Sequence, residues 1–358
     1  MCKATGSVDA IVNLGLNYIS VHLLYAGVFV ISAFLSLSTG TSVGAIVALA
    51  AIVMSFADKT GASLSVLSAS LLGGAMFGDN LSFISDTTIA ATQSMGCKMK
   101  DKFKQNFKIA LLAAGITLII LLVQGFFLED SIYLSNSAKI ELVRIIPYLL
   151  VIILAIIGVN VFAVLLTGIF AAGAIGLFYG NFDMMGFAKL SYEGFTGMTE
   201  IFLLSMLMGG LAALVTKEGG LEYISRFINK KVNRKTGYLG IGCLVGFTNF
   251  AIANNTVSII VTGSIAKDIC SKLKLDKVKV ASVLDIFACF TQGLLPYGAQ
   301  VLLILSYAEG KIGYFDLIAN TWYLWLLLVG TLFYLQLKIK KSPPKISETH
   351  KIVAVLEA

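Results

Sequence analysis

Long apolar segments fill most of this sequence, and they constrain its fold more than any other feature. Segments such as Ile109–Phe127 and Thr321–Leu337 approach the length of about 20 apolar residues that a helix needs to cross a bilayer. Hydrophobic residues make up 57% of the 358 residues and charged residues only 13%, unlike a soluble domain. Lipid leaves only helices and closed barrels as spanning structures. Because the apolar runs are continuous rather than alternating, an all-α polytopic membrane protein is predicted.

The net charge of +7 does not indicate a nucleic-acid partner, because the lysines cluster in short stretches between apolar segments. Such an excess of basic residues is typical of cytoplasmic loops. We therefore expect a multi-pass protein of the cytoplasmic membrane with a cytoplasmic C-terminus. The stretches predicted to be cytoplasmic are Cys97–Lys108, Lys217–Lys235, Lys267–Lys279 and the tail 339–358.

One apolar segment, 64–95, contains a polar stretch that hydrocarbon does not solvate. Gly78–Thr88 (GDNLSFISDTT) carries Asp79 and Asp86, with hydroxyl and amide side chains around them. A carboxylate at the centre of a membrane helix costs at least about 2.5–3.5 kcal/mol, so it must face a cavity, an ion or a partner. A polar loop outside the membrane is the alternative interpretation, but the basic run that follows already supplies a loop. A broken membrane helix whose unwound middle binds a cation is predicted.

Polar interruptions occur in three further apolar segments. Val21–Ala57 is divided by SLSTGTSVG at Ser36–Gly44, which predicts a re-entrant helical hairpin over 21–57; one continuous span is the alternative. The segment 236–266 has a polar break at Asn254–Thr256 and lies between two basic stretches, which predicts a second hairpin. A proline and two glycines interrupt 280–307, which predicts a second broken helix.

These elements recur in the same order at a nearly constant offset of roughly 211–215 residues. The basic loops put the ends of the first hairpin outside and those of the second inside. Two inverted-topology repeats are therefore predicted, over 1–127 and 139–338, with the substrate bound where they meet. Three spans within Glu141–Val215 have no counterpart in the first repeat. The first repeat is accordingly expected to be incomplete, with the chain truncated at its N-terminus.

Four motifs carry a resemblance to a known family. AMFGDNLSFISDTT and SLSTGTSVGA resemble signature regions of the NhaC-type Na⁺/H⁺ antiporters, and ANNTVSIIVTGSIAKDI and DIFACFTQGLLPYGAQ resemble second-half segments of one branch. The resemblance covers nearly all of residues 3–338 and is specific around 36–95 and 249–300. It implies the ion transporter superfamily architecture: two inverted repeats and a transport domain that moves against a scaffold, commonly in a homodimer. It also implies exchange of Na⁺ for H⁺ by a secondary transporter.

Oxygen-bearing side chains at the hairpin tips and the helix break form the candidate site, because a hard cation such as Na⁺ prefers oxygen ligands. A carboxylate that binds Na⁺ when ionised and H⁺ otherwise makes the two ions compete, which is antiport in its minimal form. Asp86 is the first candidate because hydroxyl side chains flank it, Asp79 is the second, and Na⁺ is expected at both. The expected cation ligands are Asp86, Asp79, Ser85, Thr87, Thr39, Thr41, Ser42, Asn254, Asn255 and Thr256, with Asp285, Gln292 and Gln300 as candidate partners from the second half.

Two other classes of function stay open. One is exchange of an organic anion, such as malate for lactate, coupled to Na⁺ or H⁺, as related members of the family perform; amides at hairpin tips and helix N-termini bind anions. The other is a non-transporting truncated fragment. An enzyme is not expected, because the sequence contains no nucleophile–base set, phosphate loop or metal cluster. The expected partners are the lipid bilayer, Na⁺ and H⁺, with no cofactor.

Overall fold

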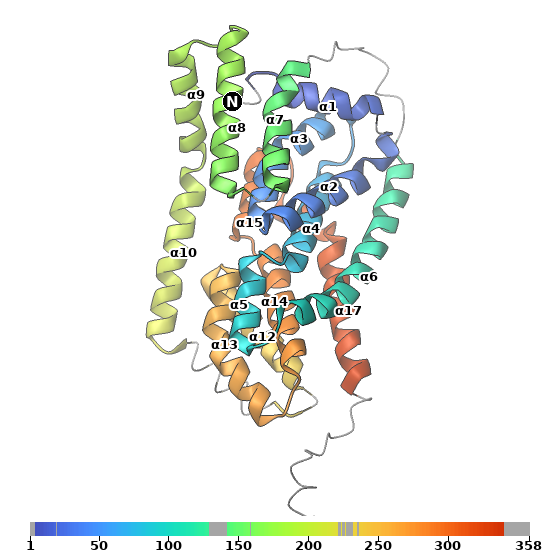
Figure 1. Cartoon of the computed structure of the whole chain (residues 1–358), viewed down its shortest axis with the longest axis vertical. Helices are drawn as coiled ribbons and strands as arrows, with labels where there is room; N and C mark the ends of the chain where they lie inside the picture. Colours follow the sequence, from blue (N-terminus) through green and yellow to red (C-terminus); the bar gives the residue numbers. More distant parts are fainter. Residues whose placement is uncertain are drawn as a thin grey trace, which may run out of the picture.

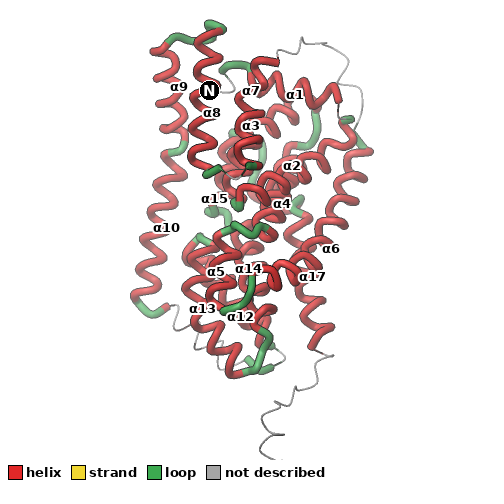
Figure 2. The backbone as a smooth tube through the Cα atoms, viewed as in Figure 1, coloured by secondary structure: helices red, strands yellow, loops and turns green. Residues whose placement is uncertain are grey.

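The computed structural model is helical throughout the part of the chain that it describes (Figure 2). Five helical segments in that part are long and apolar enough to cross a membrane, and four shorter helices are apolar as well. The prediction of an all-α protein with several spanning helices is therefore confirmed. Most of the stretch 217–235 and of the tail 339–358 lies outside the described residues. These are 4–18, 20–128, 142–157, 159–220, 223, 226, 232–234 and 236–339.

The described helices are shown in chain order, from blue to red, in Figure 1. Helices end and new helices begin at the polar interruptions of the apolar segments. In order, the elements are α1 (Ser7–Tyr18), η1 (Val21–Leu23), α2 (Leu24–Thr39), α3 (Ser42–Thr60), α4 (Leu64–Leu81), α5 (Asp86–Met95), α6 (Met99–Phe126), α7 (Leu142–Ile156), α8 (Val161–Phe178), α9 (Met184–Gly197), α10 (Thr199–Lys217), α12 (Gly237–Ile252), α13 (Asn255–Lys272), α14 (Lys277–Leu294), α15 (Ala299–Tyr307), α16 (Tyr314–Ala319) and α17 (Trp322–Ile339).

The segment from α2 to α5 has a counterpart in the segment from α12 to α15. The ends of α2 and α4 and the starts of α3 and α5 each lie 213 residues before the matching boundary in the second half. Gly40 and Ala253 hold the two hairpin turns in the left-handed conformation, with φ of 71° and 55°. Thr41 and Asn254 then cap the next helix by accepting a hydrogen bond from the third residue on. The two halves therefore repeat in local geometry as well as in order.

The packing inside each half repeats too. Ser36 Oγ of α2 donates to the Ala75 carbonyl of α4 at 2.6 Å, and Asn249 Nδ2 of α12 donates to the Ala288 carbonyl of α14 at 2.9 Å. Gly74 and Gly78 allow α4 to approach α2 closely, because a Cβ at either position would overlap a carbonyl oxygen of α2, that of Phe29 or that of Ala33. These contacts fix each broken helix against the first helix of its own hairpin.

The short helices that follow the breaks pack on the opposite half. Ala91 and Met95 of α5 are buried in a core made largely by α12, α13 and α14. Conversely, Val301 and Ile304 of α15 belong to the core around α2, α3 and α4. This exchange places the helix breaks beside the hairpin turns near the middle of the molecule (Figure 2).

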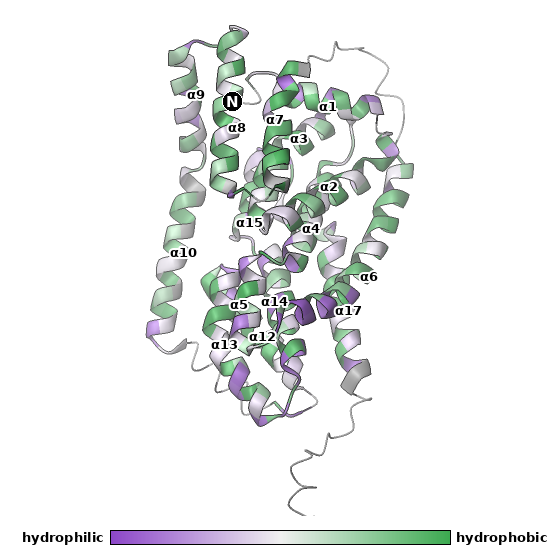
Figure 3. Cartoon of the chain, viewed as in Figure 1, coloured by the Kyte–Doolittle hydropathy of each residue, from purple (hydrophilic) through white to green (hydrophobic). Residues whose placement is uncertain are grey.

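The prediction of a loop over 97–108 is wrong. α6 begins at Met99, so the basic run forms its first turns (Figure 3). Residues four apart lie on one helix face, and this face turns Lys102 and Asn106 into the protein while Lys100 and Lys104 stay exposed. The count of lysines identified a polar stretch, but it did not reveal that Lys102 is buried and pairs with the buried carboxylate of Asp285.

Candidate functional site

Asp79 lies in the last turn of α4 and is 5% exposed. Ser85 Oγ donates to its Oδ1 at 2.5 Å, and Ser42 Oγ donates to its Oδ2 at 2.8 Å. Thr87 Oγ1 lies 2.9 Å from Ser85 Oγ. Among the described residues, no lysine or arginine bonds to Asp79. The carboxylate is thus held by neutral hydroxyl groups where the first helix break meets the first hairpin turn.

A chain of amide side chains connects Asp79 to the second half. Gln300 Nε2 on α15 donates to Ser42 Oγ at 3.0 Å, and Gln292 Nε2 on α14 donates to Gln300 Oε1 at 3.0 Å. Gln292 Nε2 also reaches the carbonyl of Ala253, in the second hairpin turn, at 3.4 Å. Gln292 Oε1 is buried and accepts no hydrogen bond from the described residues. A buried oxygen in this condition favours a water or a cation as its partner.

A second polar cluster centres on Asp285 of α14, which is fully buried. Lys102 Nζ lies 2.5 Å from Asp285 Oδ2. Asn80 Nδ2 and Asn106 Nδ2 each donate to the same oxygen at 2.9 Å. Ser282 Oγ completes the cluster with a short hydrogen bond to Asn106 Oδ1. This cluster connects α4, α6 and α14, and it adjoins Asp79 through the neighbouring residue Asn80.

Asp86, the first candidate from sequence, occupies a different environment from Asp79. It is the first residue of α5 and its side chain is exposed. Among the described residues, no hydrogen bond or ion pair joins its carboxylate. The two aspartates are seven positions apart in the sequence, but the break between α4 and α5 prevents one helix face from presenting both. An ionised carboxylate in a membrane protein needs water, an ion or a polar partner around it.

The other predicted ligands lie at the hairpin turns and have local partners. Thr39 Oγ1 donates to the Leu35 carbonyl at 2.9 Å. Thr41 and Asn254 cap helices, and Asn255 Oδ1 accepts from the Thr256 amide at 3.0 Å. The predicted residues that come together around Asp79 are Ser42, Ser85, Thr87, Gln292 and Gln300.

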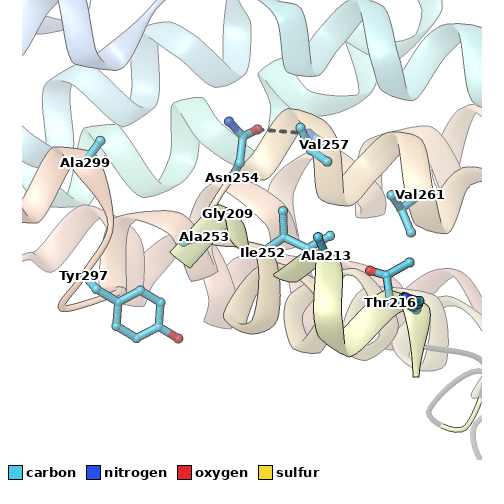
Figure 4. A pocket seen from close by; sticks show the side chains of 11 residues that line it. Gly209, Ala213, Thr216, Ile252, Ala253, Asn254, Val257, Val261, Tyr297 and Ala299 are labelled. Carbon is cyan, nitrogen blue, oxygen red and sulfur yellow. Dashed lines mark hydrogen bonds between the residues drawn. The ribbon is translucent and has the colours of Figure 1, made fainter. Parts of the chain in front are cut away.

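A pocket of about 710 Å³ opens beside the second hairpin turn, between α10, α12, α13 and α15 (Figure 4). Asn254 and Tyr297 lie on its wall, and Thr216 of α10 lies across from α13. Lys217 of α10 lines the pocket as well. Ala253 and Ala299, which also line it, adjoin the Gln292–Gln300 chain. The pocket therefore lies beside the Gln292–Gln300 chain, on the side of the second half.

Sequence reasoning missed Lys102, Asn106, Asn80 and Ser282. Their contacts span between 14 and 205 residues of sequence, so the sequence does not show which residues they contact. One signal was available: Lys102 and Asn106 are spaced by four residues, and a helical reading of the basic run places them on one face.

The sequence of this chain matches the model of the Na⁺/H⁺ antiporter family over residues 2–126 and 134–339. The chain belongs to the Na⁺/H⁺ antiporter family. This membership confirms the predicted family and, with it, the prediction of an antiporter. The matched residues include both hairpins, both broken helices and every residue of the two polar clusters.

Two relatives belong to the same class of protein. The malate-2H⁺/Na⁺-lactate antiporter of Bacillus subtilis is 25% identical over 326 residues, which cover 82% of this chain and 69% of that protein. An uncharacterised Na⁺/H⁺ antiporter of Haemophilus influenzae is 34% identical over 91 residues, which cover 25% of this chain and 19% of that protein. Both names describe antiporters that involve Na⁺ and H⁺.

Proposed function

We propose that this antiporter exchanges Na⁺ for H⁺ at the carboxylate of Asp79. The observation that carries the proposal is the burial of Asp79 among neutral donors, the hydroxyl groups of Ser42 and Ser85 and the backbone amide of Ser42, at the junction of a helix break and a hairpin turn. A buried carboxylate must be neutralised by a proton or a cation. Because no basic side chain among the described residues does so, the site is suited to either ion in turn.

The hydroxyl groups of Ser42 and Ser85 suit both the free ionised carboxylate and the carboxylate that binds Na⁺. A serine hydroxyl donates one hydrogen bond and accepts through two lone pairs. Ser42 and Ser85 donate to the ionised carboxylate, and rotation of the same hydroxyls would present their oxygens to Na⁺. Gln300 already donates to Ser42, so a rotation of the Ser42 hydroxyl would change a hydrogen bond with the second half. Gln292 Oε1, which accepts no hydrogen bond from the described part of the chain, supplies a further oxygen nearby in this network.

Asp86 has a supporting role in this proposal. Its carboxylate is exposed at the start of α5, one residue after Ser85. We place it on the path by which a hydrated cation arrives, rather than in the dry part of the site. The turn residues Thr39, Thr41, Asn254, Asn255 and Thr256 would join the ligands only if the hairpin turns moved during transport.

The proposed architecture comprises two inverted repeats, within 1–127 and 139–338, each with a re-entrant hairpin. The ion pair between Lys311 Nζ and Asp58 Oδ1, at 2.6 Å, supports this arrangement, because it brings together the C-terminal end of α3 and the connection after α15, which the lysine rule places on the same side. The proposal includes a cytoplasmic C-terminus and a homodimer.

Single cysteines at Lys100, Lys272 and Lys311, in a chain without its native cysteines, test the orientation: an impermeant thiol reagent outside cells should label only Lys311→Cys. Labelling of Lys100→Cys from outside would refute the inversion.

The exchange itself is tested in proteoliposomes. An outward proton gradient should drive uptake of ²²Na⁺, and an inward Na⁺ gradient should drive proton release, with no organic anion present. Empty liposomes and liposomes without a pH gradient are the controls. Absence of both movements from a correctly folded protein would refute the proposed exchange.

Organic-anion exchange is the second candidate, and two observations favour it. The Bacillus subtilis relative is named for malate and lactate. The pocket beside α10 falls within the size range of small-molecule sites, and it offers Lys217 and the N-terminal end of α13 to a carboxylate. Proton-coupled Na⁺ movement that requires lactate or malate would establish this candidate over simple exchange.

A further inference from the structure

The surroundings of the Lys102 ammonium group have the chemistry of a cation site. Lys102 Nζ lies 2.5 Å from Asp285 Oδ2, 2.7 Å from Thr88 Oγ1 and 3.2 Å from the Asn80 carbonyl oxygen. One carboxylate, one hydroxyl and one backbone carbonyl are the oxygen types that bind hard cations. Lys102 is 1% exposed and Asp285 is fully buried, so these oxygens form a closed group.

The backbone at the C-terminal end of α4 also favours a cation at this position. Asn80 is in the last turn of α4, where carbonyl groups lack intrahelical partners and the helix dipole favours positive charge. The Asn80 carbonyl is one of these groups, and it accepts from both Lys102 and Asn106. The end of α4 thus presents a freed carbonyl to Lys102 while Asp79, one residue earlier, faces the hydroxyl groups.

We propose that the oxygens of Asp285, Thr88 and Asn80 form a second monovalent-cation site, which the ammonium group of Lys102 permanently fills. Lys102 acts as a tethered cation. It neutralises Asp285, so that Asp79 alone is left to exchange ions, and each transport cycle moves one Na⁺. This inference deepens the proposed function by assigning its ion count.

The geometry explains why a lysine rather than an ion occupies this position. A free ion can leave a site, whereas the ammonium group is held by the α6 backbone. Asp285 Oδ2 also accepts from Asn80 and Asn106, so its charge is fully compensated while Lys102 stays in place. Removal of the ammonium group would leave a buried, uncompensated carboxylate and an oxygen-lined gap close to the size of the lost group.

The test replaces Lys102 with methionine, which keeps most of the side-chain length and removes the charge. The Asp79→Asn protein serves as the parent, so that the first site does not contribute. Thermal unfolding in detergent and ²²Na⁺ binding are measured in NaCl and in choline chloride at equal ionic strength. The parent should show no Na⁺ dependence. Lys102→Met in this parent should bind one Na⁺ and unfold about 5 °C higher in saturating Na⁺ than in choline.

Two controls distinguish a cation site from a merely structural ion pair. Lys104→Met removes an exposed lysine from the same helix and should add no Na⁺ dependence. Asp285→Asn, added to Lys102→Met, removes the carboxylate and should abolish the Na⁺ binding gained. With Asp79 intact, Lys102→Met should raise the bound Na⁺ from one per chain to two.

Two results would overturn the inference. One is a folded Lys102→Met protein that binds no additional Na⁺; the other is a protein that unfolds equally in Na⁺ and in choline. A variant that folds only in Na⁺ would support it. Failure of the proposed function looks different: the Asp79→Asn parent would itself keep its Na⁺ binding, and the comparison of Lys102→Met with that parent would still decide this inference.

Discussion

Asp79 and Asp285 are both buried aspartates on broken helices, yet their surroundings differ in one decisive respect. Hydroxyl groups of Ser42 and Ser85 hold Asp79, whereas the ammonium group of Lys102 holds Asp285. A carboxylate with neutral partners needs a mobile cation or a proton, and a carboxylate paired with a lysine does not. The same residue type is therefore suited to exchange in one place and to fixed charge in the other.

The two carboxylates do not occupy equivalent positions in the two halves. The 213-residue offset that relates the helix boundaries places Gln292 opposite Asp79. Gln292 is buried, but it carries no charge. The halves thus share a scaffold and differ in chemistry, and this difference leaves one exchangeable carboxylate at their junction.

The largest expected effect is that of Asp79→Asn on transport. Asparagine has nearly the shape of aspartate but cannot ionise or release a proton, so ΔpH-driven ²²Na⁺ uptake should fall to the level of empty proteoliposomes. Asp101→Asn, an exposed site on α6, is the matched control and should keep its activity. Wild-type uptake by Asp79→Asn would remove this residue from the mechanism.

Asp285→Asn should act on stability instead. Its removal leaves the Lys102 charge buried without a partner, which typically costs about 3–5 kcal/mol. The double variant Lys102→Met with Asp285→Asn should recover most of that loss, because both charges are gone. Unfolding of the purified protein in detergent measures the effect. Equal stability of Asp285→Asn and wild type would show that the pair is not coupled as described.

Loss of a single hydroxyl at the Asp79 site should have an intermediate effect. A hydrogen bond to a charged group contributes about 1.5–3 kcal/mol, so Ser42→Ala and Ser85→Ala should each weaken apparent Na⁺ affinity by about tenfold or more. Ser282→Ala, in the Asp285 cluster, is the matched control and should leave Na⁺ affinity near wild type. Equal losses in all three variants would mean that the two clusters act as one site.

Asp86→Asn should have the smallest effect, a decrease of about threefold in the rate of Na⁺ uptake at low ionic strength, since exposed charges act mainly by attracting ions and are screened by salt. High salt should remove the difference from wild type. Abolished transport in Asp86→Asn, with exchange retained in Asp79→Asn, would show that Asp86 carries the exchanged cation. That result would restore Asp86 as the first candidate, as the sequence predicts.

The scaffold was more predictable from sequence than the site. The interruptions of apolar segments, at Gly40–Thr41 and Ser82–Ser85 among others, depend on local residues such as glycine and hydroxyl-bearing side chains, so the positions where helices end and begin could be predicted. Which aspartate is buried depends on how α5 is oriented relative to α4. α4 packs in the core of the first half and α5 in the core of the second half, and the sequence does not show this. The pairing of Lys102 with Asp285 joins residues 183 positions apart, and a basic run gives no sign of such a partner.

The most direct test of the account is equilibrium binding of ²²Na⁺ to wild type and Asp79→Asn across pH. If Na⁺ and H⁺ compete for Asp79, the apparent dissociation constant for Na⁺ in wild type should rise by up to about tenfold per pH unit below the pKa of the site. Asp79→Asn should bind no Na⁺ at any pH. Binding by wild type that does not change with pH, or undiminished binding by Asp79→Asn, would contradict the account.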